Sequence, residues 1–240
     1  MLKPLISLVA SITLIFLSSC EDSSRKVAKN QKANKKEATV NDIPETRVET
    51  TTKKEEVAFV LTEENAIDFF FKYAKEVKET KARLTTNIGS FTIQLYDNVP
   101  YHKGNFIYLI KQGYFDNTQF HRIVRDFIIQ GGNSDDKETA KKRRKIGRYL
   151  LPPDTRKGHK HHRGTISMPS SERDNPHKLA SPYEFFIVVT QPGSYHLDGS
   201  YTPFGKVIEG MDVVDKINRV AVDQGDWPMQ NVYILKAEVF

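Results

Sequence analysis

The segment from Phe120 to Gly132 constrains the fold of this chain more than any other. It reads Phe-His-Arg-Ile-Val-Arg-Asp-Phe-Ile-Ile-Gln-Gly-Gly, an apolar stretch that carries a cation at Arg122 and a primary amide at Gln130. Its β-branched and aromatic residues favour extended backbone. In one straight strand, Phe127 and Gln130 would lie on opposite faces because side chains alternate. A bulge or a twist is therefore needed before both can reach one site.

The sequence around this segment predicts a mainly β domain. From residue 83 onward, apolar residues recur with a period of two, and strands are expected at 83–95, with a tight turn, and at 164–168, 185–189 and 202–207. Helical spacing appears at 101–113 and 210–220. Many strands and two separated helices in a stretch of roughly 160 residues suit one domain with one core.

The amino terminus has the pattern of a bacterial secretion signal. Lys3 precedes an apolar stretch from Leu5 to Leu17, which is too short to span a bilayer comfortably. The Leu-Ser-Ser-Cys sequence that ends at Cys20 resembles the lipobox of bacterial lipoproteins, so we expect a signal peptide at 1–19 and lipidation of Cys20. An ordinary signal peptide with a chance cysteine is the alternative. Cys20 is the only cysteine, which excludes intramolecular disulfides and a cysteine-ligated metal site.

A polar tether and a helix are expected between the anchor and the β domain. Residues 20–60 are rich in Lys, Glu, Asn, Thr and Ser and cannot bury enough apolar surface to offset the entropy of ordering. An accessory helix is expected within 61–81, capped by Thr62 and packed through an apolar stripe. That stripe comprises Ile67, Phe70, Phe71, Ala74 and Val77. Anchoring would place the protein in the cell envelope, on the periplasmic or surface face of a membrane, with the outer membrane favoured.

Positive charge is concentrated in one stretch. The chain has a net charge of +6, and residues 137–163 alone contain eleven Lys and Arg against two acidic residues. One basic stretch is a weak argument for nucleic-acid binding, which we do not expect; anionic lipid, cell-wall polymer, an acidic client or solvent alone are the alternatives. The insertion 134–163 is expected to form an edge of a binding groove. His159, His161 and His162 within it invite a metal hypothesis, but their basic surroundings repel a cation, so no metal and no cofactor are expected.

Three blocks of sequence, in order, resemble the cyclophilin family. They are the opening segment 120–132, Tyr183–Ile187, and the run Leu-Asp-Gly-Ser-Tyr-Thr-Pro-Phe-Gly-Lys-Val-Ile-Glu-Gly-Met-Asp-Val-Val from Leu197. The resemblance covers the chain from residue 83 to its end. It implies a closed antiparallel β-barrel of about eight strands capped by two helices, spanning 82–240, in addition to the N-terminal helix. It also implies peptidyl-prolyl cis–trans isomerase activity on proline-containing segments of exported or unfolded proteins, by a protein expected to be a monomer.

The resemblance assigns roles to particular residues. Arg122, Phe127 and Gln130 are implied as catalytic, with Gln130 also binding the substrate backbone and steadying the arginine. A guanidinium stays protonated and aims fixed N–H donors at the prolyl nitrogen, and the reaction needs no acid or base. The remaining residues implied to bind substrate are His121, Ile128, Met168, Ser170, Glu184, Phe186, His196, Leu197 and Tyr201.

Several positions depart from the usual family pattern. Glu184 stands where glutamine is common, and a carboxylate accepts hydrogen bonds but does not donate them, so a weaker grip on the substrate backbone is expected. His196 replaces a common tryptophan and Tyr201 a common histidine, which leaves cyclosporin affinity open. Two alternatives to isomerase activity remain open. The barrel could bind proline segments as a chaperone with little turnover, or it could be a scaffold for the basic insertion.

Overall fold

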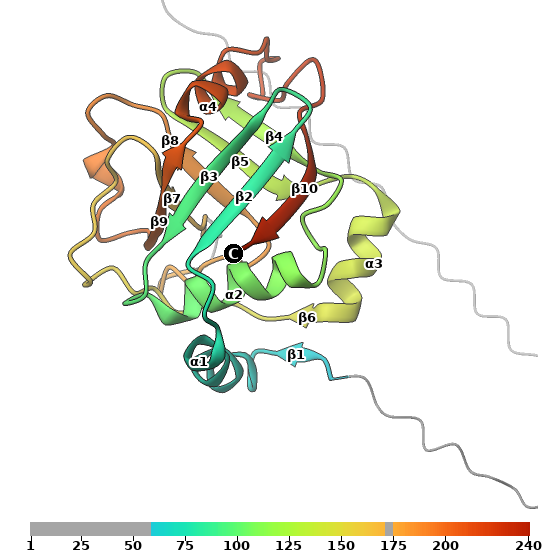
Figure 1. The fold of residues 1–240 in the computed structure, drawn as a ribbon, viewed down its shortest axis with the longest axis vertical. Coiled ribbons are helices and arrows are strands. Elements are labelled where there is room, and N and C mark those ends of the chain that lie inside the picture. The colour runs from blue at the N-terminus through green and yellow to red at the C-terminus, as the bar shows by residue number, and fades with distance from the viewer. Residues whose placement is uncertain (1–58, 171–174) are drawn as a thin grey trace, which may run out of the picture. The chain divides into compact units, whose positions relative to one another are not determined.

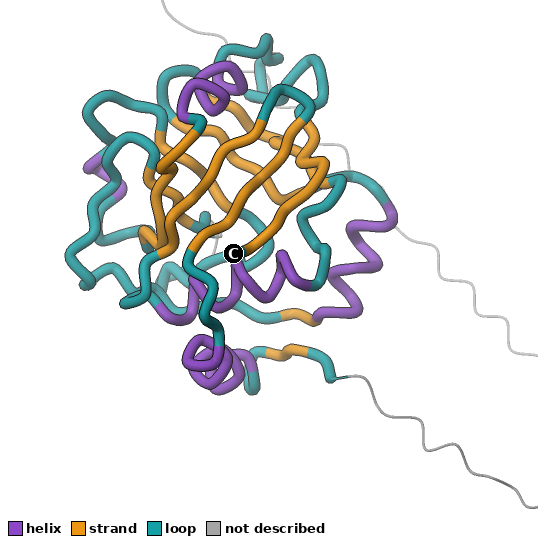
Figure 2. Tube along the Cα trace, in the orientation of Figure 1, coloured by secondary structure: helices purple, strands orange, loops and turns teal. Residues whose placement is uncertain are grey.

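The computed structural model describes residues 59–170 and 175–240, which all belong to one compact unit, Glu55–Phe240. The expected signal peptide, Cys20 and nearly all of the expected tether lie outside the described residues. The centre of the unit is a closed eight-stranded barrel with the strand order β10-β2-β3-β9-β7-β8-β5-β4 (Figures 1 and 2). Its strands are β2 (Lys81–Thr86), β3 (Ser90–Leu95), β4 (Thr118–Val124), β5 (Ile128–Asn133), β7 (Thr165–Ser167), β8 (Phe185–Val188), β9 (Pro203–Glu209) and β10 (Tyr233–Val239). Every pair in the barrel is antiparallel, and the expected fold class is confirmed.

Two helices lie at opposite ends of the barrel (Figure 1). They are α2 (Pro100–Lys111) and α4 (Met211–Asn218), the two helices that the sequence predicts around the barrel. Phe106 of α2 enters the core, where its ring lies 5.1 to 5.6 Å from those of Phe115, Phe185 and Phe204. This aromatic packing closes one end of the barrel and excludes water from it.

Alternation along the strands produces two apolar clusters. Ile123, Ile129 and Ile187 point inward and belong to the main core. Their neighbours Ile128 and Phe186 point outward and belong to a second, smaller cluster on the outside of the barrel. A period of two therefore supplies both the core and an apolar outer surface from the same strands.

The segment 120–132 is a hairpin and not one strand. Arg125, Asp126 and Phe127 form the connection between β4 and β5, and Asp126 adopts a left-handed backbone with φ of 56°. The register of β4 against β5 shifts on both sides of Phe120. The irregularity expected near Phe127 is thus a tight turn, and the hairpin sets Arg122 opposite Gln130.

The accessory helix differs in detail from the expectation. Helix α1 spans Ala66–Glu76 and packs on α2, but Thr62 is not its cap. Leu61 and Thr62 instead form a short strand, β1, and the backbone N–H of Thr62 donates to the side chain of Asn65. The predicted stripe is partly wrong because Ile67 and Phe71 are exposed. The face that packs comprises Ala66, Phe69, Phe70, Tyr73 and Val77.

The basic insertion contains a helix that the sequence analysis missed. Helix α3 (Lys137–Ile146) is capped by Asp136, whose carboxylate accepts a hydrogen bond from the Glu138 N–H. Acidic Glu138 in its first turn and three basic residues in its last turn complement the helix dipole. The chain then forms β6 (Gly147–Arg148), which pairs in parallel with β1. Among the described helices, none has the length and apolar character needed to cross a bilayer.

Candidate active site

A pocket of about 680 Å³ lies on the outer surface of the barrel, over the second apolar cluster. Its walls come from β4, β5, β8, the segment before β8 and the 3₁₀ turn η1 (Tyr195–Leu197). Nine of the twelve residues expected at the site line it. The lining residues are Arg122, Phe127, Ile128, Gln130, Pro169, Ser170, Ser181, Glu184, Phe186, Leu197 and Tyr201.

Arg122 supplies the fixed positive charge of the pocket. Its Nη2 atom lies 3.4 Å from Oδ2 of Asp226, in the loop between α4 and β10. The backbone of the same loop is tied to β4, because the Ile123 N–H donates to the Asp226 carbonyl at 2.8 Å. No described side chain accepts a hydrogen bond from the guanidinium, so its N–H groups remain available at the pocket.

The side chain of Gln130 forms a hydrogen bond with Glu184 and none with the side chain of Arg122, although the two residues are paired across β4 and β5. Its Nε2 donates to Oε2 of Glu184 at 2.9 Å, and His121 Nε2 lies 3.5 Å from the same oxygen. Burial opposes ionisation of Glu184, but the contacts with His121 and Gln130 and the charge of Arg143 outweigh it and lower the pKa of the carboxyl. The expectation that Gln130 steadies the arginine is therefore wrong for this structure. Glu184 accepts the hydrogen bond from the Gln130 amide, and Asp226 is the ion-pair partner of Arg122.

The apolar wall of the pocket is tightly packed. Phe186 and Leu197 are buried, and the ring of Tyr201 meets Phe186 edge-on with centroids 5.5 Å apart. Phe127 lies at the rim, where His196 stacks on its ring at 5.4 Å. Such a wall accepts a compact apolar ring and excludes water from it.

Three expected site residues do not line the pocket. Met168 is buried in the main core, His121 lies behind Glu184, and His196 supports Phe127 from outside. Two lining residues, Pro169 and Ser181, were absent from the expected set. Pro169 directly precedes Ser170, so its position was a usable signal, whereas Ser181 carries no motif.

A buried hydrogen-bonded chain stands behind Phe186. The His161 ring lies nearly parallel to that of Phe186, with centroids 6.1 Å apart. Its Nδ1 lies 2.7 Å from Oδ1 of Asp198, and its Nε2 lies 2.9 Å from Oγ of Ser167. Burial lowers the pKa of His161 against the opposing effect of Asp198. Because Ser167 and the ring are fully buried, the three residues brace the pocket wall and offer no nucleophile to a substrate.

The histidines of the insertion contact different partners. His159 stacks on Tyr96 and contacts Asn98, whereas His162 contacts Tyr195. Within residues 59–170 and 175–240, no group of three or more potential ligands could hold a metal ion. No residue from 134 to 163 lines this pocket itself, whereas residues within 143–150 of the insertion line a neighbouring pocket that shares Ser181 and Glu184 with it.

Comparison with known proteins gives a consistent result. Residues 81–239 match the family model described as cyclophilin type peptidyl-prolyl cis-trans isomerase/CLD. A peptidyl-prolyl cis-trans isomerase of Arabidopsis thaliana is 37% identical over 158 residues, covering 65% of this chain and 91% of that protein. One of Acinetobacter baylyi is 33% identical over 178 residues, covering 69% and 88%.

Longer relatives and solved structures extend this result. A peptidyl-prolyl cis-trans isomerase-like protein of Rhizopus delemar is 36% identical over 172 residues; the match covers 71% of this chain but 31% of that protein. The crystal structure of a cyclophilin type isomerase of Cryptosporidium parvum superposes with a TM-score of 0.57 at 27% identity, covering 68% of this chain and 98% of the other. A second structure of that protein, in the presence of the dipeptide Ala-Pro, gives 0.56. The chain therefore belongs to the cyclophilin-type peptidyl-prolyl cis–trans isomerase family.

Proposed function

We propose that this chain accelerates cis–trans isomerisation of Xaa-Pro bonds in exported polypeptides, from a lipid anchor at Cys20 in the bacterial cell envelope. The observation that carries the catalytic part is the pocket itself. It combines an always-protonated guanidinium, Arg122, with a buried apolar wall that includes Phe186 and Leu197. The relative crystallised in the presence of Ala-Pro supports a proline-containing peptide as substrate.

The mechanism follows from the chemistry of the peptide bond. Rotation faces a barrier of about 18 to 20 kcal/mol because the C–N bond has partial double-bond character. Twisting removes this conjugation and gives the prolyl nitrogen a lone pair that accepts a hydrogen bond. A donor fixed beside that nitrogen stabilises the twisted state more than either planar state, which lowers the barrier. Arg122 is this donor, while Phe127, Phe186 and Leu197 hold the proline ring.

The catalytic proposal is tested with Arg122→Ala and Arg122→Lys. Both should lower kcat/KM for an Ala-Pro peptide, the alanine variant by about 100-fold or more, as for other removed transition-state donors. Protease-coupled or NMR exchange measurements give the rate, and peptide titration gives the affinity. Wild-type rates equal to those in buffer, with peptide binding retained, would favour the chaperone alternative.

The export proposal depends on the first twenty residues. Small residues before Cys20 and the short apolar stretch support cleavage and lipidation at that cysteine. Several acyl chains anchor a protein far more stably than one. Cys20→Ser should move the protein from the membrane fraction to the soluble fraction while leaving isomerase activity intact. An unchanged distribution would contradict anchoring.

A further inference from the structure

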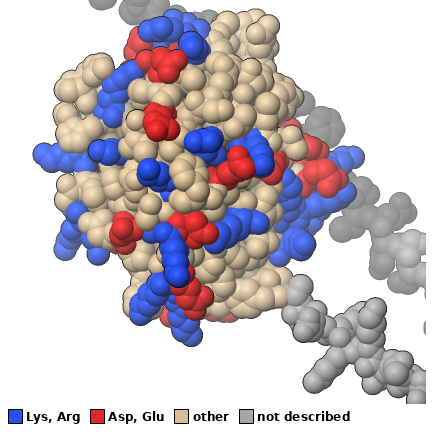
Figure 3. All heavy atoms as spheres, in the orientation of Figure 1, with Lys and Arg blue, Asp and Glu red and all other residues tan. Residues whose placement is uncertain are grey.

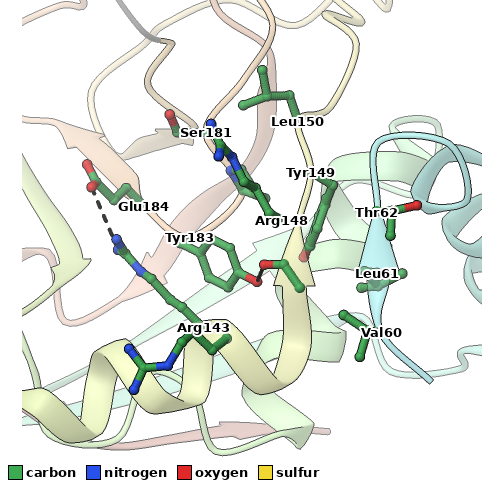
Figure 4. A pocket seen from close by; sticks show the side chains of 13 residues that line it. Val60, Leu61, Thr62, Arg143, Arg148, Tyr149, Leu150, Ser181, Tyr183 and Glu184 are labelled. Atoms are coloured by element: carbon green, nitrogen blue, oxygen red, sulfur yellow. Dashed lines mark hydrogen bonds and ion pairs between the residues drawn. The ribbon is translucent and has the colours of Figure 1, made fainter. Parts of the chain in front are cut away.

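A second pocket, of about 630 Å³, adjoins the active site (Figure 4). We call it the β1–β6 pocket, because its walls are β1 with Val60, the last turn of α3, β6 with the two following residues, and Ser181–Glu184. Ser181 and Glu184 also line the active-site pocket, so the two form one continuous surface. Strand β1 lies outside the residues that match the family model, so one wall belongs to the part of this chain that precedes the match.

The β1–β6 pocket is held in shape by backbone pairing. Leu61 is fully buried and pairs with Gly147, where φ is 135° and any Cβ would collide with the Leu61 backbone. The Tyr183 hydroxyl donates to the Gly147 carbonyl at 2.6 Å, which ties β6 to the segment before β8. A preformed pocket of this kind loses little conformational entropy when a ligand enters.

The charges of the β1–β6 pocket are not balanced. Arg143 is held by a hydrogen bond of 2.8 Å from its Nε to the Tyr114 hydroxyl, and its Nη2 is buried with no hydrogen-bond acceptor among the described residues. Glu184 lies 3.9 Å from that Nη2 but already accepts from Gln130 (Figure 4). Arg144 and Arg148 are exposed at the rim and form no ion pair with any described residue. Three guanidinium groups thus line the pocket with one carboxylate; Figure 3 shows blue side chains, with red ones among them, on the α3 side of the molecule.

We propose that the β1–β6 pocket binds an acidic side chain of the substrate, a few residues from its proline, and so selects acidic proline-containing segments. Val60 and Leu150 offer apolar surface to the methylene groups of a glutamate. The arginines offer donors to its carboxylate, a pairing stronger than a neutral hydrogen bond. An extended peptide advances about 3.3 Å per residue, so a chain with its proline in the first pocket reaches the second within a few residues. The inference rests on the proposed isomerase function.

The test uses an Ala-Pro parent peptide and a set of single variants of it. In each variant, one of the four positions on either side of the proline is changed to Glu or to Gln. In the wild type, kcat/KM at one position should favour Glu over Gln by about fivefold or more, as expected for about 1 kcal/mol of charge-assisted binding. The double variant Arg144→Gln/Arg148→Gln should reduce this preference to less than about twofold. Lys145→Gln is the matched control, because this exposed residue of α3 does not line the β1–β6 pocket.

The outcomes separate the two proposals. No acceleration of the parent peptide by the wild type refutes the isomerase function itself. Normal turnover of the parent, with equal rates for Glu and Gln at every position, refutes the subsite alone. A Glu preference that survives in the double variant, or that Lys145→Gln removes equally, also overturns it, because the preference would then come from long-range charge.

Discussion

The ion pair between Arg122 and Asp226 makes a quantitative prediction about how the catalytic cation is held. Asp226 has φ of 65°, a conformation that asparagine tolerates, so Asp226→Asn removes the charge with little change of shape. The side chains are 43% and 37% exposed, and pairs exposed to this degree contribute about 0.2 to 1 kcal/mol. If the free energy of this ion pair orients Arg122 for the transition state, kcat/KM of the Asp226→Asn variant should be lower than that of the wild type by up to about fivefold.

The measurement is the NMR exchange rate of an Ala-Pro peptide at low ionic strength. Salt screens partly exposed pairs, so the difference between wild type and Asp226→Asn should shrink at about 1 M salt. Asp223→Asn is the control on the same loop, since asparagine retains the oxygen that accepts from the N–H groups of Gly225 and Trp227. An unchanged or increased rate in Asp226→Asn, or an equal loss in the control, would show that other contacts position the arginine.

Three further variants test the fold and the polar network. Phe185→Ala removes a fully buried ring that meets three phenylalanine rings edge-on, and should cost about 3 to 5 kcal/mol of unfolding free energy in urea titrations. Glu184 has a folded pKa below its ordinary 4.5, so its ionisation stabilises the fold above that pH and this contribution is lost as the pH falls through the folded value. The unfolding free energy of Glu184→Gln should therefore lack that part of the acid dependence between pH 7 and 3; an unaltered slope would contradict the network. Gly147→Val should detach β1 from β6, seen as faster hydrogen exchange near Leu61, with the Ala-Pro rate preserved.

The sequence was sufficient to predict the barrel and most of the pocket. Alternating apolar residues specify strands whose two faces are both used, as Ile129 and Ile128 show. The resemblance of three blocks to the cyclophilin family implied that Arg122, Phe186 and Leu197 share one site, and all three line the pocket. Periodicity predicts the strands, whereas the closed barrel and the residues of the pocket were implied by the resemblance of these blocks to the cyclophilin family.

The pairing of polar side chains could not be predicted in the same way. Whether Gln130 turns to Arg122 or to Glu184, and whether Asp226 approaches the arginine, depends on loop paths and rotamers that leave no periodic signal. Helix α3 was missed because its basic residues suggested a solvated loop. Its cap, Asp136, and the charge order along it were present in the sequence and would have indicated a helix.

The pairing of β10 with both β2 and β4 has a consequence for how the protein is made. The first and last strands of the barrel, β2 and β10, are neighbours. Strand β10 also pairs with β4, so it closes the gap between β2 and β4. During synthesis the barrel cannot close until β10 has left the ribosome, and a truncated chain ending before Tyr233 would leave the edges of β2 and β4 unpaired. Because such edges recruit other chains, truncated copies should aggregate and should not act as weak isomerases.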